Sequence, residues 1–183
     1  MRPGQVAAVL VLSSLWGSGS GSGRAFAQDR EASSLVALLS GIEWVPGRQD
    51  LETRGVDAAD LIGLYGDEDV SVVVQIRAVE LLVHFREPAV RVFLDGVARV
   101  RGQHAAFLRA AAASLAPHGD GSVPTLSRLV CHPDRSVREA SARALGAVRT
   151  PAAWAALRRR QAAEPDENVR RAIDVALAAA PSL

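Results

Sequence analysis

Two stretches near the end of the sequence repeat one pattern at a fixed distance. Residues 132–146 read HPDRSVREASARALG, and residues 164–178 read EPDENVRRAIDVALA. Both contain P-D-x-x-V-R-x-A-x-x-x-A-L at a constant offset (165 − 133 = 32; 169 − 137 = 32). A repeat of about this period, with helical spacing inside each copy, is typical of stacked helix pairs and constrains the chain to an α-solenoid.

Each copy carries one continuous stripe of small and apolar residues. The stripe runs at i, i+3, i+4, i+7, i+8 and i+11, from Val137 through Leu145 to Val148 in the first copy and from Val169 through Leu177 to Ala180 in the second. This is the spacing of one helix face. A single helix pair cannot bury such a face, so the copies must stack. We therefore expect an all-α fold, an α-solenoid of about four stacked antiparallel helix pairs.

Charged residues recur at two positions of the motif. Asp134 and Asp166 each precede the apolar stripe, where an aspartate can cap the N-terminus of a helix. Arg138 and Arg170 lie at the edge of the stripe. We favour a structural role for both arginines, in which the guanidinium group binds an aspartate or a carbonyl of the adjacent repeat. A ligand contact is the alternative.

The motif P-D-x-x-V-R-x-A-x-x-x-A-L resembles the HEAT repeat family. It is most similar to the short bacterial type that also occurs in the HEAT-like repeats of phycobilisome lyases. The resemblance implies antiparallel helix pairs stacked into a curved array, which such proteins usually use to bind other proteins. It implies a scaffold and names no reaction.

Weaker copies of the stripe precede the two clear ones. Val74 and Phe107 take the place of the first stripe valine, at offsets of 63 and 30 from Val137 (137 − 74 = 63; 137 − 107 = 30). The polar residues 48–55 predict a loop. Helices are predicted over residues 33–45, 56–65, 70–85, 89–100, 104–116, 122–131 and 151–161. We expect Ser122 and Thr150 to cap the last two.

The first 27 residues have the features of a secretory signal. Arg2 precedes an apolar run over residues 6–16, a Gly/Ser stretch follows over 17–23, and Ala25-Phe26-Ala27 forms an A-x-A cleavage site. The alternatives are an uncleaved anchor and a disordered tail. We expect cleavage, which leaves residues 28–183 as a HEAT-like repeat domain without a membrane span. The protein is then periplasmic or extracellular.

The sequence carries no recognised catalytic, cofactor or metal motif. All 21 basic residues are arginine, so Schiff-base chemistry and a phosphate-loop lysine are excluded. Cys131 and His132 offer only two possible metal ligands, and Cys131, the single cysteine, is expected to be buried. We therefore predict a protein that is not an enzyme and needs no cofactor or metal.

Charge is divided unevenly along the expected mature chain. Residues 28–127 carry 9 Arg and 14 acidic residues, a balance of −5, and residues 128–183 carry 10 Arg and 6 acidic residues, a balance of +4. The clusters at 158–160 and 170–171 could form an anion-binding or partner-binding patch. We favour a solvated face. No aromatic residue interleaves with these arginines, which makes nucleic-acid binding the weaker reading.

The favoured function is an exported, non-catalytic scaffold that binds another protein. Two alternatives remain: a lyase-like or enzyme-accessory protein, and a nucleic-acid binder. We expect the second helix of each pair to build the inner face of the array. Its polar positions Glu139, Arg143, Arg171 and Asp174 are the predicted contact residues. The sequence leaves the partner and the oligomeric state open.

Overall fold

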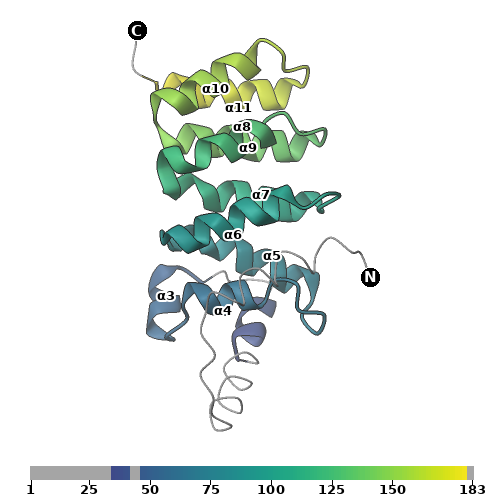
Figure 1. Cartoon of the computed structure of the whole chain (residues 1–183), viewed down its shortest axis with the longest axis vertical. Helices are drawn as coiled ribbons and strands as arrows, with labels where there is room; N and C mark the ends of the chain where they lie inside the picture. The colour runs from purple at the N-terminus through teal and green to yellow at the C-terminus, as the bar shows by residue number, and fades with distance from the viewer. Residues whose placement is uncertain (1–33, 42–45, 181–183) are drawn as a thin grey trace.

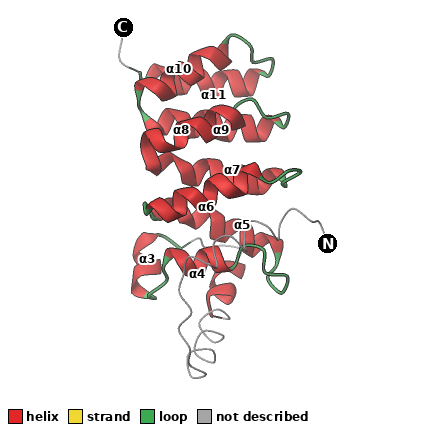
Figure 2. Cartoon of the chain, viewed as in Figure 1, coloured by secondary structure: helices red, strands yellow, loops and turns green. Residues whose placement is uncertain are grey.

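The computed structural model describes residues 34–41 and 46–180, and these residues form helices without any strand (Figures 1 and 2). A helix over residues 34–40 comes first. The α-helices that follow are α3 (Arg48–Thr53), α4 (Ala58–Gly63), α5 (Val72–Leu81), α6 (Pro88–Arg99), α7 (Ala105–Leu115), α8 (Val123–Leu129), α9 (Arg135–Val148), α10 (Pro151–Gln161) and α11 (Glu167–Ala178). Two short 3-10 helices are η1 (Leu82–His84) and η2 (Ala116–Ser122).

The helices form pairs that stack along the long axis of the molecule (Figure 1). They are α4–α5, α6–α7, α8–α9 and α10–α11. The second helices α5, α7, α9 and α11 pack on one another in order, and α6, α8 and α10 form the other layer. Within the described residues, extensive contacts run between neighbouring pairs. The predicted α-solenoid is therefore confirmed.

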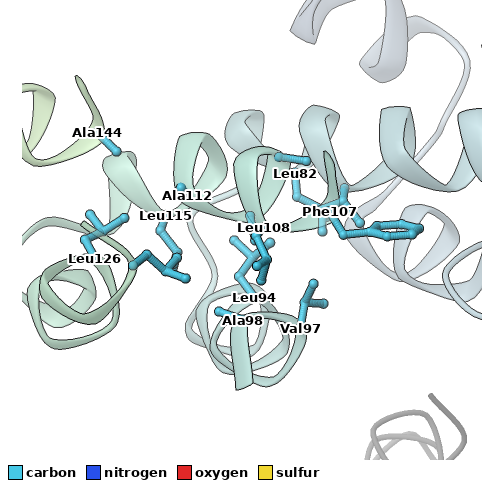
Figure 3. Close-up of a cluster of buried hydrophobic side chains, with 14 of the residues drawn as sticks. Leu82, Leu94, Val97, Ala98, Phe107, Leu108, Ala112, Leu115, Leu126 and Ala144 are labelled. Atoms are coloured by element: carbon cyan, nitrogen blue, oxygen red, sulfur yellow. The ribbon is translucent and has the colours of Figure 1, made fainter. Parts of the chain in front are cut away.

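The core lies between the two layers and follows the predicted stripe. Val137, Leu145 and Val169 are fully buried, whereas Leu177 at the end of α11 is half-buried. Figure 3 shows the centre of the core, where side chains of α6, α7 and α8 meet. Burial of such side chains contributes about 1.5–3 kcal/mol each, so stacking supplies most of the stability.

The helix caps that the motif predicts are present. Oδ1 of Asp134 accepts the backbone N–H of Ser136 at 2.8 Å, and Oδ1 of Asp166 accepts that of Asn168 at 2.9 Å. Thr150 caps α10 through its side-chain oxygen. Hydrogen bonds lower the pKa of both aspartates because they stabilise the carboxylate form. The side chain of Ser136 contributes most for Asp134, and the backbone N–H of Val169 contributes most for Asp166.

The predicted loop over residues 48–55 was wrong, because six of these residues form α3. The segment has a single strongly apolar residue, Leu51, and that residue is 1% exposed. The N-terminus of α3 is closed locally, since Asp50 accepts the N–H of Gly47 at 2.8 Å. The helix α3 therefore depends on one buried leucine and one local cap, and it has no apolar periodicity that the sequence analysis could detect.

Two predictions around α8 were also wrong. Ser122 does not cap the helix, because its hydroxyl donates to the carbonyl of Gly119 at 2.7 Å instead. Cys131 is exposed, since α8 ends at Leu129 and the cysteine lies in the turn beyond it. The thiol is therefore accessible.

The helices α9 and α11 approach each other closely at one point. A Cβ atom at Gly146 would lie 2.6 Å from Cβ of Ala176, which is far inside van der Waals contact. Glycine is therefore required on α9 for this approach. The contact lies in the C-terminal halves of both helices.

The predicted signal segment, residues 1–27, lies outside the described residues. None of the described helices combines the length and the hydrophobicity of a membrane span.

Candidate functional site

A groove follows the second-helix layer between α9 and α11. We name it the α9–α11 groove; it has a volume of about 500 Å³. The close approach at Gly146 joins the two helices at one end, and the groove lies toward their N-termini. Its lining residues are Arg135, Ser136, Glu139, Arg143, Asp166, Asn168, Arg171, Ala172 and Val175.

Three of the four predicted contact residues meet in this groove. Glu139 and Arg143 come from α9, and Arg171 comes from α11. The offset between Glu139 and Arg171 is one repeat (171 − 139 = 32), so stacking of the two copies places them side by side. The fourth residue, Asp174, does not line the groove.

Asp174 lies instead toward α10. Its Oδ1 accepts the Nε2 amide of Gln161 at 2.6 Å. Asp174 corresponds to Ala142 in the preceding copy (174 − 142 = 32), and Ala142 is fully buried. Asp174, three residues after Arg171, therefore lies on a different face of α11 from the groove residues Arg171 and Val175.

Charges in the groove are mostly paired, with one exception. The guanidinium of Arg143 binds the Glu139 carboxylate at 2.5 Å, and that of Arg135 lies 3.8 Å from Asp166. Arg171 has no carboxylate partner among the described residues. Surface pairs of this kind contribute little to stability. The groove therefore keeps one uncompensated positive charge.

An apolar side chain lies one helical turn from that charge. Val175 is 69% exposed. It lines the groove beside Arg171 on the same face of α11. Together they offer a cation and an apolar contact to an approaching chain.

A second groove continues the surface toward α5. It has a volume of about 360 Å³ and shares Arg143 with the first. Its floor consists mainly of alanine, and Glu80 and Arg109 lie at its edge. Desolvation raises the pKa of Glu80, while Arg109 and Arg77 oppose that shift. The small side chains leave the helix backbones open to close approach.

A buried cluster of charged side chains connects α9, α10 and the turn before α11. Nε and Nη2 of Arg138 donate to the Glu164 carboxylate at 3.0 Å each, and Nη1 donates to the carbonyls of His132 and Pro133. Glu164 lies in the turn before α11, in the adjacent pair. Arg160 of α10 binds the same carboxylate at 2.7 Å.

The environment of Glu164 has opposing effects on its ionisation. Burial alone raises its pKa, but Arg138, the backbone N–H of Asp166 and Arg160 together lower the pKa below the usual value. The carboxylate is therefore ionised at neutral pH and satisfied from three directions. This arrangement fixes the turn before α11.

The two motif arginines differ in what they contact. Arg138 is 8% exposed and binds the carboxylate just described. Arg170 is exposed, and Nη2 donates at 3.2 Å to the carbonyl of Pro165 in its own pair. The inter-repeat bond expected for both arginines is thus made by the first and not by the second.

The run of three arginines at 158–160 does not act as a unit. Arg160 is held by Glu164, whereas Arg158 and Arg159 are exposed without a described carboxylate partner. Both lie on α10, in the layer opposite the α9–α11 groove. Among the described residues, no group of three histidine, cysteine or acidic side chains is placed to hold a metal ion.

Sequence reasoning missed two residues of this region, Glu164 and Val175. At the Glu164 position, the preceding copy has His132 (164 − 132 = 32), so the motif gives no signal. At the Val175 position it has Arg143 (175 − 143 = 32), and the valine reads as one more apolar helix residue. Both residues are exceptions within an otherwise regular repeat.

Comparison with protein families agrees with this architecture. A family model described as HEAT repeats matches residues 97–178, from the end of α6 through α11. This part of the chain belongs to the HEAT repeat family. The predicted resemblance to the HEAT repeat family is confirmed, and HEAT repeats generally mediate protein–protein interaction. A search of curated proteins gave no match to the chain.

Proposed function

We propose that this HEAT protein is an exported, non-catalytic scaffold that binds a partner protein in the α9–α11 groove. The observation that carries the proposal is the groove itself, where a free cation at Arg171 adjoins the exposed Val175. A partner that supplies a carboxylate and an apolar side chain would satisfy both. Exposed apolar residues bordered by charges are common features of protein-binding surfaces.

Rigidity of the groove supports the same proposal. The Arg138–Glu164 pair joins α9 to the turn before α11, and the Gly146–Ala176 contact joins the two helices near their other ends. Both walls of the groove are therefore held before a partner arrives. A preformed surface loses less conformational entropy on binding than a mobile one does.

Export is the second part of the proposal, and it rests on the sequence of residues 1–27. A basic residue, an apolar run and an A-x-A site occur in the order that signal peptidases recognise. Expression with a C-terminal tag in a bacterial host should give an exported chain that begins at Gln28. A chain that keeps Met1 and stays in the cytoplasm would contradict export without affecting the groove.

Affinity capture tests the scaffold proposal. The bait is the tagged mature chain, 28–183, immobilised through its tag because the sequence has no lysine for amine coupling. We expect one saturable partner from the exported fraction of the source cells. Its binding should be lost in Arg143→Glu/Arg171→Glu and kept in Arg158→Glu/Arg159→Glu, which makes the same charge change outside the groove. Equal capture by both variants would overturn the groove as the binding site.

The exposed Arg158 and Arg159 favour one alternative, binding of nucleic acid through α10. Phosphate contacts release counterions, so such binding must weaken steeply as salt rises. The alternative requires that Arg158→Glu/Arg159→Glu abolish binding of a labelled DNA duplex at low salt. Absence of low-salt binding by the wild-type protein would exclude it.

A further inference from the structure

The turn between α4 and α5 is chemically complementary to the α9–α11 groove. This acidic loop, Asp67-Glu68-Asp69, is exposed, and the two residues that begin the α5 face beside it, Val72 and Val73, are 55% and 58% exposed. The groove offers the free cation Arg171 and the exposed Val175. Three of the four exposed large apolar residues that the structure describes thus belong to these two places.

The acidic loop is held in a fixed shape. The side chain of Gln75 is buried, and Nε2 donates to the carbonyls of Asp67 at 2.8 Å and Val70 at 2.9 Å. Its Oε1 accepts the N–H of Gly66 at 3.0 Å. A buried amide that satisfies three backbone groups orders the turn before any contact is made.

Two carboxylates of this loop are available for binding. Asp67 uses Oδ1 to accept the N–H of Asp69 at 2.9 Å, which closes the turn. The carboxylates of Glu68 and Asp69 have no hydrogen-bond or ion-pair partner among the described residues. The loop therefore presents unpaired carboxylates next to two exposed valines. The groove presents the unpaired Arg171 next to the exposed Val175.

The two places cannot meet within one chain. The acidic loop joins α4 to α5 near one end of the stack, whereas the groove lies between α9 and α11 at the other end (Figure 2). A contact between them requires two molecules, and it leaves one loop and one groove open in the resulting dimer. This is a heterologous contact, in which different surfaces of identical chains meet.

We propose that the protein self-associates head to tail, with the acidic loop and Val72–Val73 of one copy bound in the α9–α11 groove of the next. Arg171 takes the carboxylate of Glu68 or Asp69, and Val175 packs against the valines. The contact is small, so the association is weak and concentration-dependent. It uses the groove of the proposed function, and a partner protein therefore competes with self-association.

Sedimentation velocity of the purified protein at rising concentration tests this proposal. We expect the weight-average sedimentation coefficient to rise with concentration and to fall when salt is raised, because the contact is partly ionic. Arg171→Glu and Glu68→Arg/Asp69→Arg should each weaken self-association by about tenfold or more. Arg158→Glu, an exposed arginine outside the groove, is the matched control and should behave as the wild type does.

A mixing experiment distinguishes this contact from general charge effects. Arg171→Glu keeps its acidic loop, and Glu68→Arg/Asp69→Arg keeps its groove. An equimolar mixture should therefore associate through the loop of the first variant and the groove of the second, whereas neither variant associates alone. Circular dichroism and thermal melting establish that both variants are folded.

Two results would overturn the proposal. One is a wild-type protein that remains monomeric at every concentration, and the other is a mixture that associates no more than its components. Neither result affects the scaffold proposal, which is judged by capture of a different protein and its loss in Arg143→Glu/Arg171→Glu. Val175→Ser gives a further check, since it should weaken self-association at high salt as well as at low salt.

Discussion

The helices α9 and α11 carry the same motif, yet their neighbours give its residues different roles. In α9, Arg138 is buried against a carboxylate of the next pair, and Leu145 is fully enclosed. In α11, the matching Arg170 is exposed and Leu177 is half-buried. The motif thus specifies an inter-repeat contact, and the contact forms only where another pair supplies the second partner.

A polar substitution accompanies this difference. Where α9 has the buried Ala142, α11 has Asp174, which binds Gln161 of α10. Asp174 is exposed, and a polar residue is favourable where a helix face is in contact with water. Equivalent positions of the two copies therefore differ: the residue is buried in α9 and exposed to water in α11.

The largest difference in stability is expected between alanine variants of the two motif arginines. Arg138→Ala should lower the free energy of unfolding by about 3 kcal/mol, because it leaves part of the buried Glu164 carboxylate unpaired. Arg170→Ala should lower it by less than about 0.5 kcal/mol, as expected for an exposed residue. Urea denaturation followed by circular dichroism measures both. Equal losses would mean that the buried pair is not what distinguishes the two copies.

A smaller effect is expected at the point where the two copies touch. Gly146→Ala places a Cβ atom against Ala176 and should cost about 1–3 kcal/mol. Adding Ala176→Gly should restore part of the loss. Gly96→Ala is the control, because no atom lies within 4 Å of the new Cβ in α6, and it should gain up to about 1 kcal/mol. Thermal melting that ranks the two alanine variants in the opposite order would refute the close contact.

The smallest expected effect is a pH dependence that belongs to the Arg138–Glu164 pair. The folded pKa of Glu164 is lowered from the value of about 4.3 that a glutamate has in an unfolded chain. The stabilisation is therefore full above that value and is lost as the pH falls through the folded pKa. The stability gap between wild type and Arg138→Ala should be constant near pH 7 and narrow at acidic pH. A gap that stays constant down to pH 3 would show that the pair acts by packing alone.

The fold could be predicted from the sequence wherever periodicity and burial coincide. The stripes of α9 and α11 identified the repeat, and the weaker stripe of α5 was found by its offset to Val137, since Val74 and Ala78 are both buried. The helix α3 was missed because it depends on the single apolar residue Leu51. Its remaining support comes from elsewhere in the fold: Arg48 donates to the carbonyl of His84, 36 residues away.

The candidate site was predictable only as far as the repeat is regular. One period separates Glu139 from Arg171, so the sequence alone places them together. Glu164 follows no such rule, because its partner Arg138 lies 26 residues away and joins a turn to a helix. Turn residues vary between copies, and their contacts depend on the packing of the whole pair.

The stacking of pairs has a mechanical consequence. Contacts run mainly from each pair to its neighbours, so a pull on the two ends of the molecule passes through the pairs in series. Each interface then carries the full load, and the weakest one yields first. The α8–α9 and α10–α11 pairs are joined by a buried salt bridge as well as by apolar packing, so we expect their interface to separate at a higher force than one held by apolar packing alone.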